Sequence, residues 1–289
     1  MMLMVGALAI GISIGIVTGL FGVGGGFLIT PLLNIVLGVP MPVAVGTGAV
    51  QILGVSTSGL FSRRRETLTD YKMALVLFGG NIAGVQLGAT TLESLSTLGH
   101  FTFGDQQIVA VEFVLLWVFT VVLGGITAFL LYDTSRINAS PDKRVGLFAR
   151  IKIPPYTDFD TLEEPRLSLV VMSYFGLALG FMTGLLGIGG GVLMMPALIY
   201  LVGMRTHKAA ATSLAIIWSS SFVATITHAT LGNADLLLAI PLFVGGSAGL
   251  QLGTRLYSRL QGPQLRRYFA FISLAATFLV VTRILTVML

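Results

Sequence analysis

Gly15-Ile-Val-Thr-Gly-Leu-Phe-Gly-Val-Gly-Gly-Gly-Phe-Leu-Ile-Thr-Pro31 returns 165 positions later as Gly180-Phe-Met-Thr-Gly-Leu-Leu-Gly-Ile-Gly-Gly-Gly-Val-Leu-Met-Met-Pro196. The two stretches share ten of seventeen residues, including all six glycines and the proline. Each is an apolar segment interrupted by the same glycine cluster. This pattern predicts two matched, discontinuous membrane helices.

The composition predicts an all-α polytopic membrane protein. Of 289 residues, 55% are hydrophobic and only 10% are charged, whereas a soluble domain carries about 25% charged residues. Long stretches contain no Lys or Arg, namely residues 1–61, 73–92 and 167–204. Apolar runs of about 20 residues are long enough to cross a bilayer as helices.

The sequence also argues against several features and partners. The first ten residues contain no basic residue, so a cleavable signal peptide is not evident and the first segment is expected to be a retained helix. The chain has no cysteine, which excludes disulfides and thiolate metal sites. The net charge of +5 reflects loops that face the cytoplasm rather than a nucleic-acid partner. No cofactor is expected.

The repeat extends well beyond the glycines. Asp70 matches Asp235, and residues 83–88 match 248–253, so an ungapped register joins 15–88 to 180–253. Each half then contains five apolar segments: 3–21, 27–38, 43–62, 71–92 and 108–131, followed by 167–186, 192–203, 209–228, 235–256 and 267–288. We expect a first membrane repeat over 1–132, a cytoplasmic linker loop over 133–166 and a second membrane repeat over 167–289.

The second segment of each half is unusually short. Twelve helical residues rise about 18 Å, against a hydrocarbon core of about 30 Å. Such a segment fits a half-helix or re-entrant arm better than a full span, although a tilted span remains an alternative.

The basic residues predict that the two repeats have inverted topology. They cluster in four connections: Arg63, Arg64, Arg65 and Lys72; Arg136, Lys143, Arg144, Arg150, Lys152 and Arg166; Arg205 and Lys208; and Arg255, Arg259, Arg266 and Arg267. The connections near 38–42, 93–107 and 229–234 have none. By the positive-inside rule, the four basic connections are cytoplasmic and the other three are external. Each loop of the first half then lies on the opposite side of the membrane from the equivalent loop of the second half, and both termini are external.

The glycine clusters are the first candidate site. Non-helical backbone survives in a membrane only inside the protein or beside a water-filled cavity. Each cluster precedes a short helix, near Phe27 and Val192, and the first N–H groups of a helix lack internal partners. Two converging N-termini predict an anion site near the midplane, formed by Gly24, Gly25, Gly26, Gly189, Gly190 and Gly191. Close packing is the alternative, and we favour it for Gly15, Gly19, Gly180 and Gly184.

Polar side chains within the spans are further substrate-binding candidates. The hydroxyls of Thr47, Thr212 and Ser213 either donate to an anion or bond to their own helix backbone. The amides of Asn81, Gln86 and Gln251 lie mid-membrane, where they either join helices or line a cavity.

Few ionisable residues fall inside the expected spans. Glu112 and Arg283 either form an ion pair, or Arg283 attracts an anion. His207 and His228 lie near helix ends and are expected to be interfacial, with proton transfer as the alternative.

The twin Gly-x-Gly-Gly-Gly-x-x-x-x-Pro segments, followed by His207-Lys-Ala-Ala-Ala-Thr-Ser-Leu214, resemble the TauE/SafE family of sulfite and organosulfonate exporters. The resemblance spans nearly the whole chain and implies transport of small sulfur-containing or carboxylate anions. The first half departs from the second motif, with Pro42-Val-Ala-Val-Gly-Thr-Gly48 in its place.

We therefore expect a secondary transporter in the cytoplasmic membrane that moves a small anion by alternating access, coupled to protons. An anion channel on the same scaffold is the alternative. An enzyme is disfavoured because three histidines, no cysteine and few acidic residues in the spans leave little for acid–base or metal chemistry. A purely structural protein would leave the matched glycine breaks unexplained. No residue pattern assigns the exact anion, the direction of transport or the oligomeric state, and the expected coupling to protons rests on no particular residue.

Overall fold

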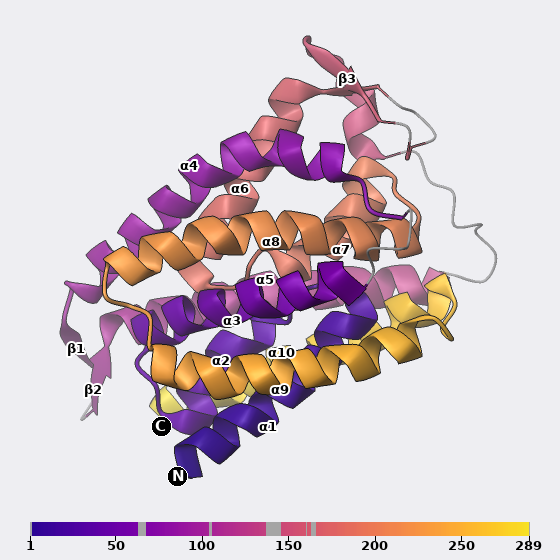
Figure 1. Cartoon of the computed structure of the whole chain (residues 1–289). Coiled ribbons are helices and arrows are strands. Elements are labelled where there is room, and N and C mark those ends of the chain that lie inside the picture. Colours follow the sequence, from indigo (N-terminus) through magenta and orange to yellow (C-terminus); the bar gives the residue numbers. More distant parts are fainter. Residues whose placement is uncertain are drawn as a thin grey trace.

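The computed structural model describes residues 2–62, 68–103, 106–136, 146–159, 161–162 and 166–288. Within these ranges, eight helices are long and apolar enough to cross a membrane, and they run alongside one another in a bundle (Figure 1). They are α1 (Met2–Phe21), α3 (Met41–Ser62), α4 (Tyr71–Ser96), α5 (Ala110–Arg136), α6 (Leu169–Leu186), α8 (Thr206–Thr230), α9 (Leu236–Tyr257) and α10 (Gly262–Met288). The expected all-α polytopic fold is confirmed.

The second segment of each half is short, as its length predicts. Helix α2 (Gly26–Leu37) has 12 residues, and α7 (Gly191–Ala197) has seven before it continues as a π-helical turn, η2 (Leu198–Val202). Both begin one residue before the positions expected from sequence. Because Gly25 and Gly190 precede these helices in the left-handed conformation, each helix starts abruptly after the glycine cluster.

The two halves of the chain pack against each other along their length. Helix α1 runs along α9, α4 along α6, α3 along α8, and α5 along α10. The 165-residue register equates α1 with α6 and α4 with α9, so the first two contacts are equivalent. A Cβ at Gly15 would lie 2.1 Å from the carbonyl oxygen of Gly246, and one at Gly180 would lie 2.3 Å from that of Asn81. These glycines therefore serve close helix packing.

Two small antiparallel hairpins lie outside the bundle. Strands β1 (His100–Phe103) and β2 (Gln106–Val109) join α4 to α5, and β3 (Tyr156–Asp158) pairs with β4 (Arg166–Ser168) before α6. The central segment also holds a short 3-10 helix, η1 (Leu147–Arg150).

The described part of the central segment, which was expected to be a linker loop, contains regular structure and packs on the bundle. Phe159 is fully buried, and the Lys72 ammonium donates to the Asp158 carbonyl oxygen at 2.6 Å. A Cβ at Gly146 would lie 2.3 Å from the Val202 carbonyl carbon, so this segment packs on η2 as well. One buried aromatic side chain, this hydrogen bond and the packing on η2 hold it on the bundle. Residues 137–145 of the linker lie outside the described ranges.

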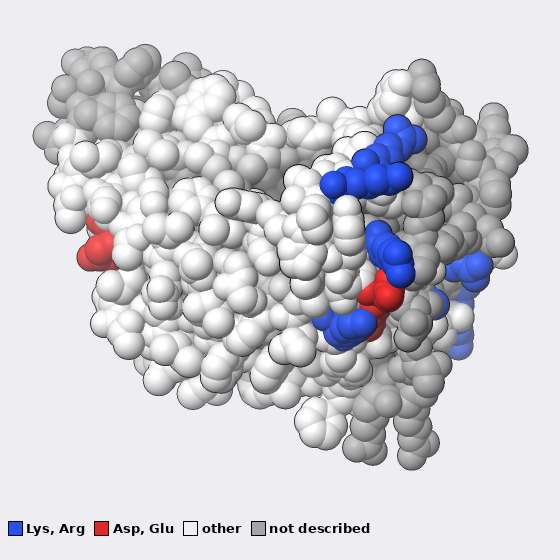
Figure 2. Space-filling view, turned by 90° about the horizontal axis from the view of Figure 1, so that it is seen from above, with Lys and Arg blue, Asp and Glu red and all other residues white. Residues whose placement is uncertain are grey.

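Basic side chains gather at one end of the bundle. In Figure 2 the blue Lys and Arg side chains lie at the end that carries the β3–β4 hairpin in Figure 1. Both termini lie at the other end, near β1 and β2 (Figure 1). Arg63, Arg64, Arg65, Lys143 and Arg144, which also support the topology expected from sequence, lie outside the described residues.

Candidate functional site

The glycine clusters form two tight loops between helices. Helix α1 ends at Phe21 and α2 begins at Gly26; α6 ends at Leu186 and α7 begins at Gly191. Six glycines in these loops have φ between +60° and +72°, namely Gly22, Gly24, Gly25, Gly187, Gly189 and Gly190. Side-chain-bearing residues rarely adopt this conformation, so the backbone itself requires the repeated glycines.

The two loops cross in direct backbone contact. A Cβ at Gly26 would lie 2.2 Å from the carbonyl oxygen of Ile188, and a Cβ at Gly191 would lie 1.5 Å from that of Val23. These two contacts are equivalent under the 165-residue register. The N-termini of α2 and α7 therefore meet at one place, between the two halves of the chain.

Mostly apolar side chains line the crossing point. Gly24 and Gly189 both face Ile52 of α3 and Ile217 of α8, which are themselves equivalent positions. The hydroxyl of Ser221 also reaches this point, because a Cβ at Gly189 would lie 3.2 Å from its Oγ atom. The glycine cradle expected from sequence is therefore a narrow, fully buried contact in this conformation.

Thr47 and Thr212 join the two halves through matching hydrogen bonds. The Thr47 Oγ1 atom accepts the backbone N–H of Asp235 at 3.0 Å, and the Thr212 Oγ1 atom accepts that of Asp70 at 3.0 Å. The two aspartates in turn cap α9 and α4. Both threonine side chains are fully buried and hold helix starts in place.

Ser213 connects α8 to the first glycine loop. Its hydroxyl lies within hydrogen-bond distance of the carbonyl oxygens of Gly22 and Ala210. In this conformation the hydroxyl is engaged with backbone, and Ser213 thus positions the loop that leads into α2.

The three amides expected from sequence lie apart from one another. The Asn81 Nδ2 atom donates to Ser220 Oγ at 2.8 Å across the α4–α8 contact, and its Oδ1 atom has no partner among the described residues. Gln86 is exposed on α4, and Gln251 is exposed on α9. Only Asn81 is buried, so the structure does not bring the amides together with the glycine loops.

Sequence reasoning missed Gln51, a buried amide residue of α3. Its side chain is fully buried in α3, and within the described ranges neither its Nε2 nor its Oε1 atom has a hydrogen-bond partner. A search guided by repeat symmetry overlooks it because the equivalent residue of the second half is Ile216. The sequence feature that could have identified Gln51 is a single amide residue inside an apolar run.

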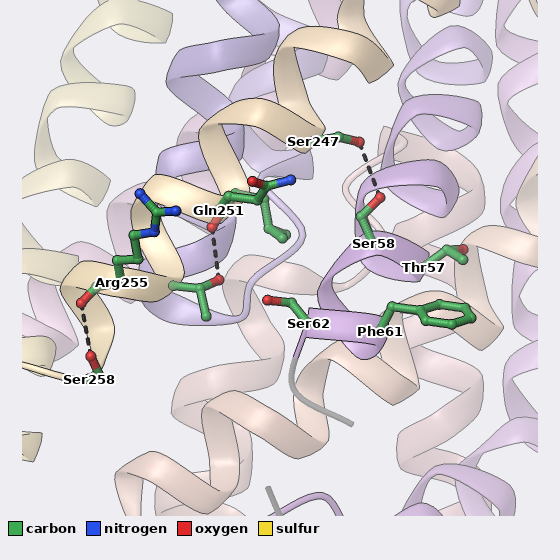
Figure 3. A pocket seen from close by; sticks show the side chains of 10 residues that line it. Thr57, Ser58, Phe61, Ser62, Ser247, Gln251, Arg255 and Ser258 are labelled. Carbon is green, nitrogen blue, oxygen red and sulfur yellow. Dashed lines mark hydrogen bonds between the residues drawn. The ribbon is translucent and has the colours of Figure 1, made fainter. Parts of the chain in front are cut away.

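A polar crevice of about 910 Å³ lies between α3 and α9. Figure 3 shows Ser58 and Ser62 on one wall and Gln251 and Arg255 on the other. The Ser58 and Ser247 hydroxyls lie 3.1 Å apart and bridge the two helices. The crevice lies toward the basic end of the bundle, because it includes the last residues of α3 and α9.

The ionisable residues of the spans have defined partners. Arg283 Nη2 lies 3.2 Å from Glu112 Oε1, so these residues form an ion pair between α10 and α5. His228 differs from the interfacial position expected for it: its side chain is fully buried, with Nε2 3.0 Å from the Gly184 carbonyl oxygen. His207 lies at the start of α8, with its ring against that of Tyr257.

Residues 7–280 match the family model described as sulfite exporter TauE/SafE. The chain belongs to the TauE/SafE family. Among curated relatives, it is 29% identical to the probable membrane transporter protein YjnA of Bacillus subtilis, over 94% of this chain and 97% of the relative. It is 28% identical to YunE of the same organism, over 87% and 88%, and 26% identical to a probable membrane transporter protein of Xylella fastidiosa, over 93% and 92%. No solved structure matches the chain.

Membership of the TauE/SafE family agrees with a transporter that sits in the membrane. Within the described ranges, no group of three or more His, Asp and Glu side chains gathers as a metal site would. The buried polar side chains of this TauE/SafE chain include the amides of Gln51 and Asn81 and the hydroxyls of Thr47, Thr212 and Ser213.

Proposed function

We propose that this protein is a secondary transporter that moves a small sulfur-containing or organic anion, such as sulfite, a sulfonate or sulfoacetate, across the cytoplasmic membrane by alternating access. The observation that carries the proposal is the reciprocal crossing of the two glycine loops, where the N-termini of α2 and α7 meet between the halves. The family description, which names sulfite export, supports the choice of substrate class.

The arrangement suits an anion because of its electrostatics. Helix N-termini carry partial positive charge and unpaired N–H groups, and in a low-dielectric interior these attract an anion without a fixed cation. Because the loops touch in this conformation, the site opens when the halves move relative to one another. The anion then lies against the glycine backbone, within reach of Thr47, Asn81, Thr212 or Ser213 as their helices shift.

The topology of the proposal follows from the positive-inside rule. The end of the bundle with the basic side chains (Figures 1 and 2) is assigned to the cytoplasm by this rule, and the end with both termini to the outside. The halves, 1–132 and 167–289, are then inverted repeats joined by the linker 133–166. Such repeats exchange inward and outward conformations by rocking about a shared site. Protons are the proposed coupling ion.

Purified protein in liposomes tests this function. We expect saturable uptake of labelled sulfite, a sulfonate or sulfoacetate, accelerated by the same anion inside the vesicles and by a proton gradient. Absence of saturable flux for all three classes overturns the substrate assignment. Steady single-channel currents without accelerated exchange would instead identify an anion channel.

A thermal-shift screen over sulfur anions provides an independent readout. A ligand that binds only the folded state raises the melting temperature, and at 100 times its dissociation constant it adds about 2.7 kcal/mol of stability. Chloride and nitrate serve as controls for general ionic effects.

A further inference from the structure

The crevice between α3 and α9 ends at a narrow contact. Its polar lining continues from Arg255 and Ser62 near the mouth to the Ser58–Ser247 hydroxyl pair. Leu250, which also lines the crevice, is 1% exposed, and Val55, one turn deeper along α3 than Ser58, is 0% exposed. The Ser58–Ser247 hydroxyl pair and the buried Val55 side chain thus lie between the crevice and the interior.

Gln51 lies directly behind this contact. It precedes Val55 by one helical turn and Ser58 by two, which is a rise of about 10 Å along α3. A Cβ at Gly246 would lie 2.8 Å from the Gln51 Nε2 atom and 2.5 Å from a Val55 methyl carbon. The missing side chain at Gly246 therefore provides the space that the amide occupies.

A buried amide without partners is costly, because it has given up its hydrogen bonds to water without replacing them. Native interiors contain few such groups, and each calls for an explanation. At Gln51 both ends of the amide are without a partner in the described part of the chain. A hydrophobic residue, such as the equivalent Ile216, would pack there at lower cost.

We infer that Gln51 binds the transported anion, and that the contact held by Ser58 and Ser247 is the gate between this residue and the cytoplasmic crevice. This rests on the proposed transport function. The Nε2 group offers two N–H donors to the oxygens of a sulfite or sulfonate. A neutral donor holds an anion weakly enough for release, while Arg255 near the mouth raises the local anion concentration.

The second half of the chain offers a related arrangement. Under the repeat register Gly246 corresponds to Asn81, and the Val55 position corresponds to Ser220. At that contact, between α4 and α8, the amide comes from α4 and bonds to Ser220. Each of the two equivalent contacts therefore carries one amide, and among the described residues the amide behind the polar crevice is the one with no partner at either end.

Replacing Gln51 by Leu tests the binding role. We expect transport to fall at least about tenfold, because a hydrogen bond to a charged ligand is lost, while the melting temperature stays the same or rises. The matched control is Ser273→Ala, which removes a buried hydroxyl bonded to Thr127 between α10 and α5. It should lower stability slightly and leave the transport rate unchanged.

The outcomes separate the two hypotheses. If wild-type protein transports and Gln51→Leu keeps its KM and kcat, the inference is overturned and the transport function stands. If wild-type protein shows no flux, the transport function fails, and a second experiment still decides the role of Gln51.

That second experiment uses the absence of cysteine from the chain. A Gln51→Cys variant is treated with a negatively charged, membrane-impermeant thiol reagent from the cytoplasmic side, with and without a sulfonate. We expect slow labelling that the sulfonate slows further, and labelling at least about tenfold faster when Ser58→Ala and Ser247→Ala are added. Labelling that neither the sulfonate nor the serine changes affect contradicts both the site and the gate.

Discussion

The carbonyl oxygen of Val23 lies so close to Gly191 that a Cβ atom there would sit 1.5 Å from it. Gly26 and Ile188 are related in the same way with the two halves exchanged. A Cβ at Gly26 would lie 2.2 Å from the Ile188 carbonyl oxygen. The two broken helices therefore meet backbone to backbone. Any motion that opens a path between the halves has to act through this contact.

A methyl group at Gly191 should prevent the two loops from packing. For Gly191→Ala we expect loss of the monodisperse folded protein, because the obstacle is backbone that cannot rotate away. Gly125→Ala is the control, since a Cβ there meets no atom of the described residues within 4 Å and lies in the interior of α5. It should retain or raise the melting temperature. Size-exclusion profiles and thermal unfolding in detergent measure both, and a wild-type profile for Gly191→Ala would contradict the contact.

Gly25 and Gly190 should respond differently to the same change. A Cβ at Gly25 would lie 2.1 Å from Ile14 Cγ2, whereas at Gly190 the nearest atom is 3.6 Å away. Gly190→Ala then costs about 1–2 kcal/mol for its left-handed backbone alone. We expect a larger fall in melting temperature for Gly25→Ala. Equal falls in melting temperature would mean that the left-handed backbone conformation, rather than the space available to a Cβ atom, determines the cost at both positions.

We expect Thr47 and Thr212 to contribute to the stability of the fold in the first place, and to anion binding only after that. Replacing either by Val leaves a backbone N–H, that of Asp235 or Asp70, without its acceptor. We expect a loss of about 1–3 kcal/mol in unfolding free energy, measured by thermal or denaturant unfolding. Serine at the same positions keeps the hydroxyl and should restore most of the stability. An unchanged melting temperature combined with weaker anion binding would favour a direct role in binding.

The Glu112–Arg283 ion pair should couple α5 to α10. Glu112→Gln and Arg283→Gln each leave the other residue's charge without its partner. The losses of stability from the two single changes should therefore add up to more than the loss from the double change. Both side chains are partly exposed, at 20% and 35%, and we expect a coupling energy on the order of 1 kcal/mol from the double-mutant cycle. Strictly additive effects would argue against the pair, and loss of anion binding only in Arg283→Gln would favour anion attraction.

Single cysteines test the proposed orientation. Thr97 follows α4 at the end of the bundle that carries the termini, and Ser258 follows α9 at the basic end. We expect Ser258→Cys to react with an impermeant thiol reagent only from the cytoplasmic side and Thr97→Cys only from outside. The reverse pattern would invert the assignment of termini and crevice.

Much of the architecture was predictable because membrane constraints act on local sequence. Apolar runs predicted the spans, and the glycine clusters located the two short helices to within one residue. Asp70 and Asp235 could be matched by register, but their role as helix caps appears only in the structure. The central segment was harder to predict, because Phe159 is buried by contacts that are distant in sequence.

The candidate site was less predictable, since it depends on side-chain contacts between helices. Repeat symmetry drew attention to Gln86 and Gln251, but the structure places Gln86 on an exposed face and Gln251 on a wall of the crevice between α3 and α9. The same criterion missed Gln51, whose equivalent is Ile216. Whether an amide in a span bonds to a neighbour, as Asn81 does, or lacks a partner depends on what the opposing helix presents.

The sequence by itself determined the membrane class, the segment order, the glycine breaks and the family, because hydropathy, charge and glycine conformation are properties of short stretches of chain. Only the tertiary structure decided that Gly191 meets Val23, that Thr47 accepts from Asp235, and that Gln51 has no partner among the described residues and lies behind a polar crevice. Those facts depend on the relative placement of helices from the two halves. That placement arises from the packing of many surfaces at once, which no local pattern encodes.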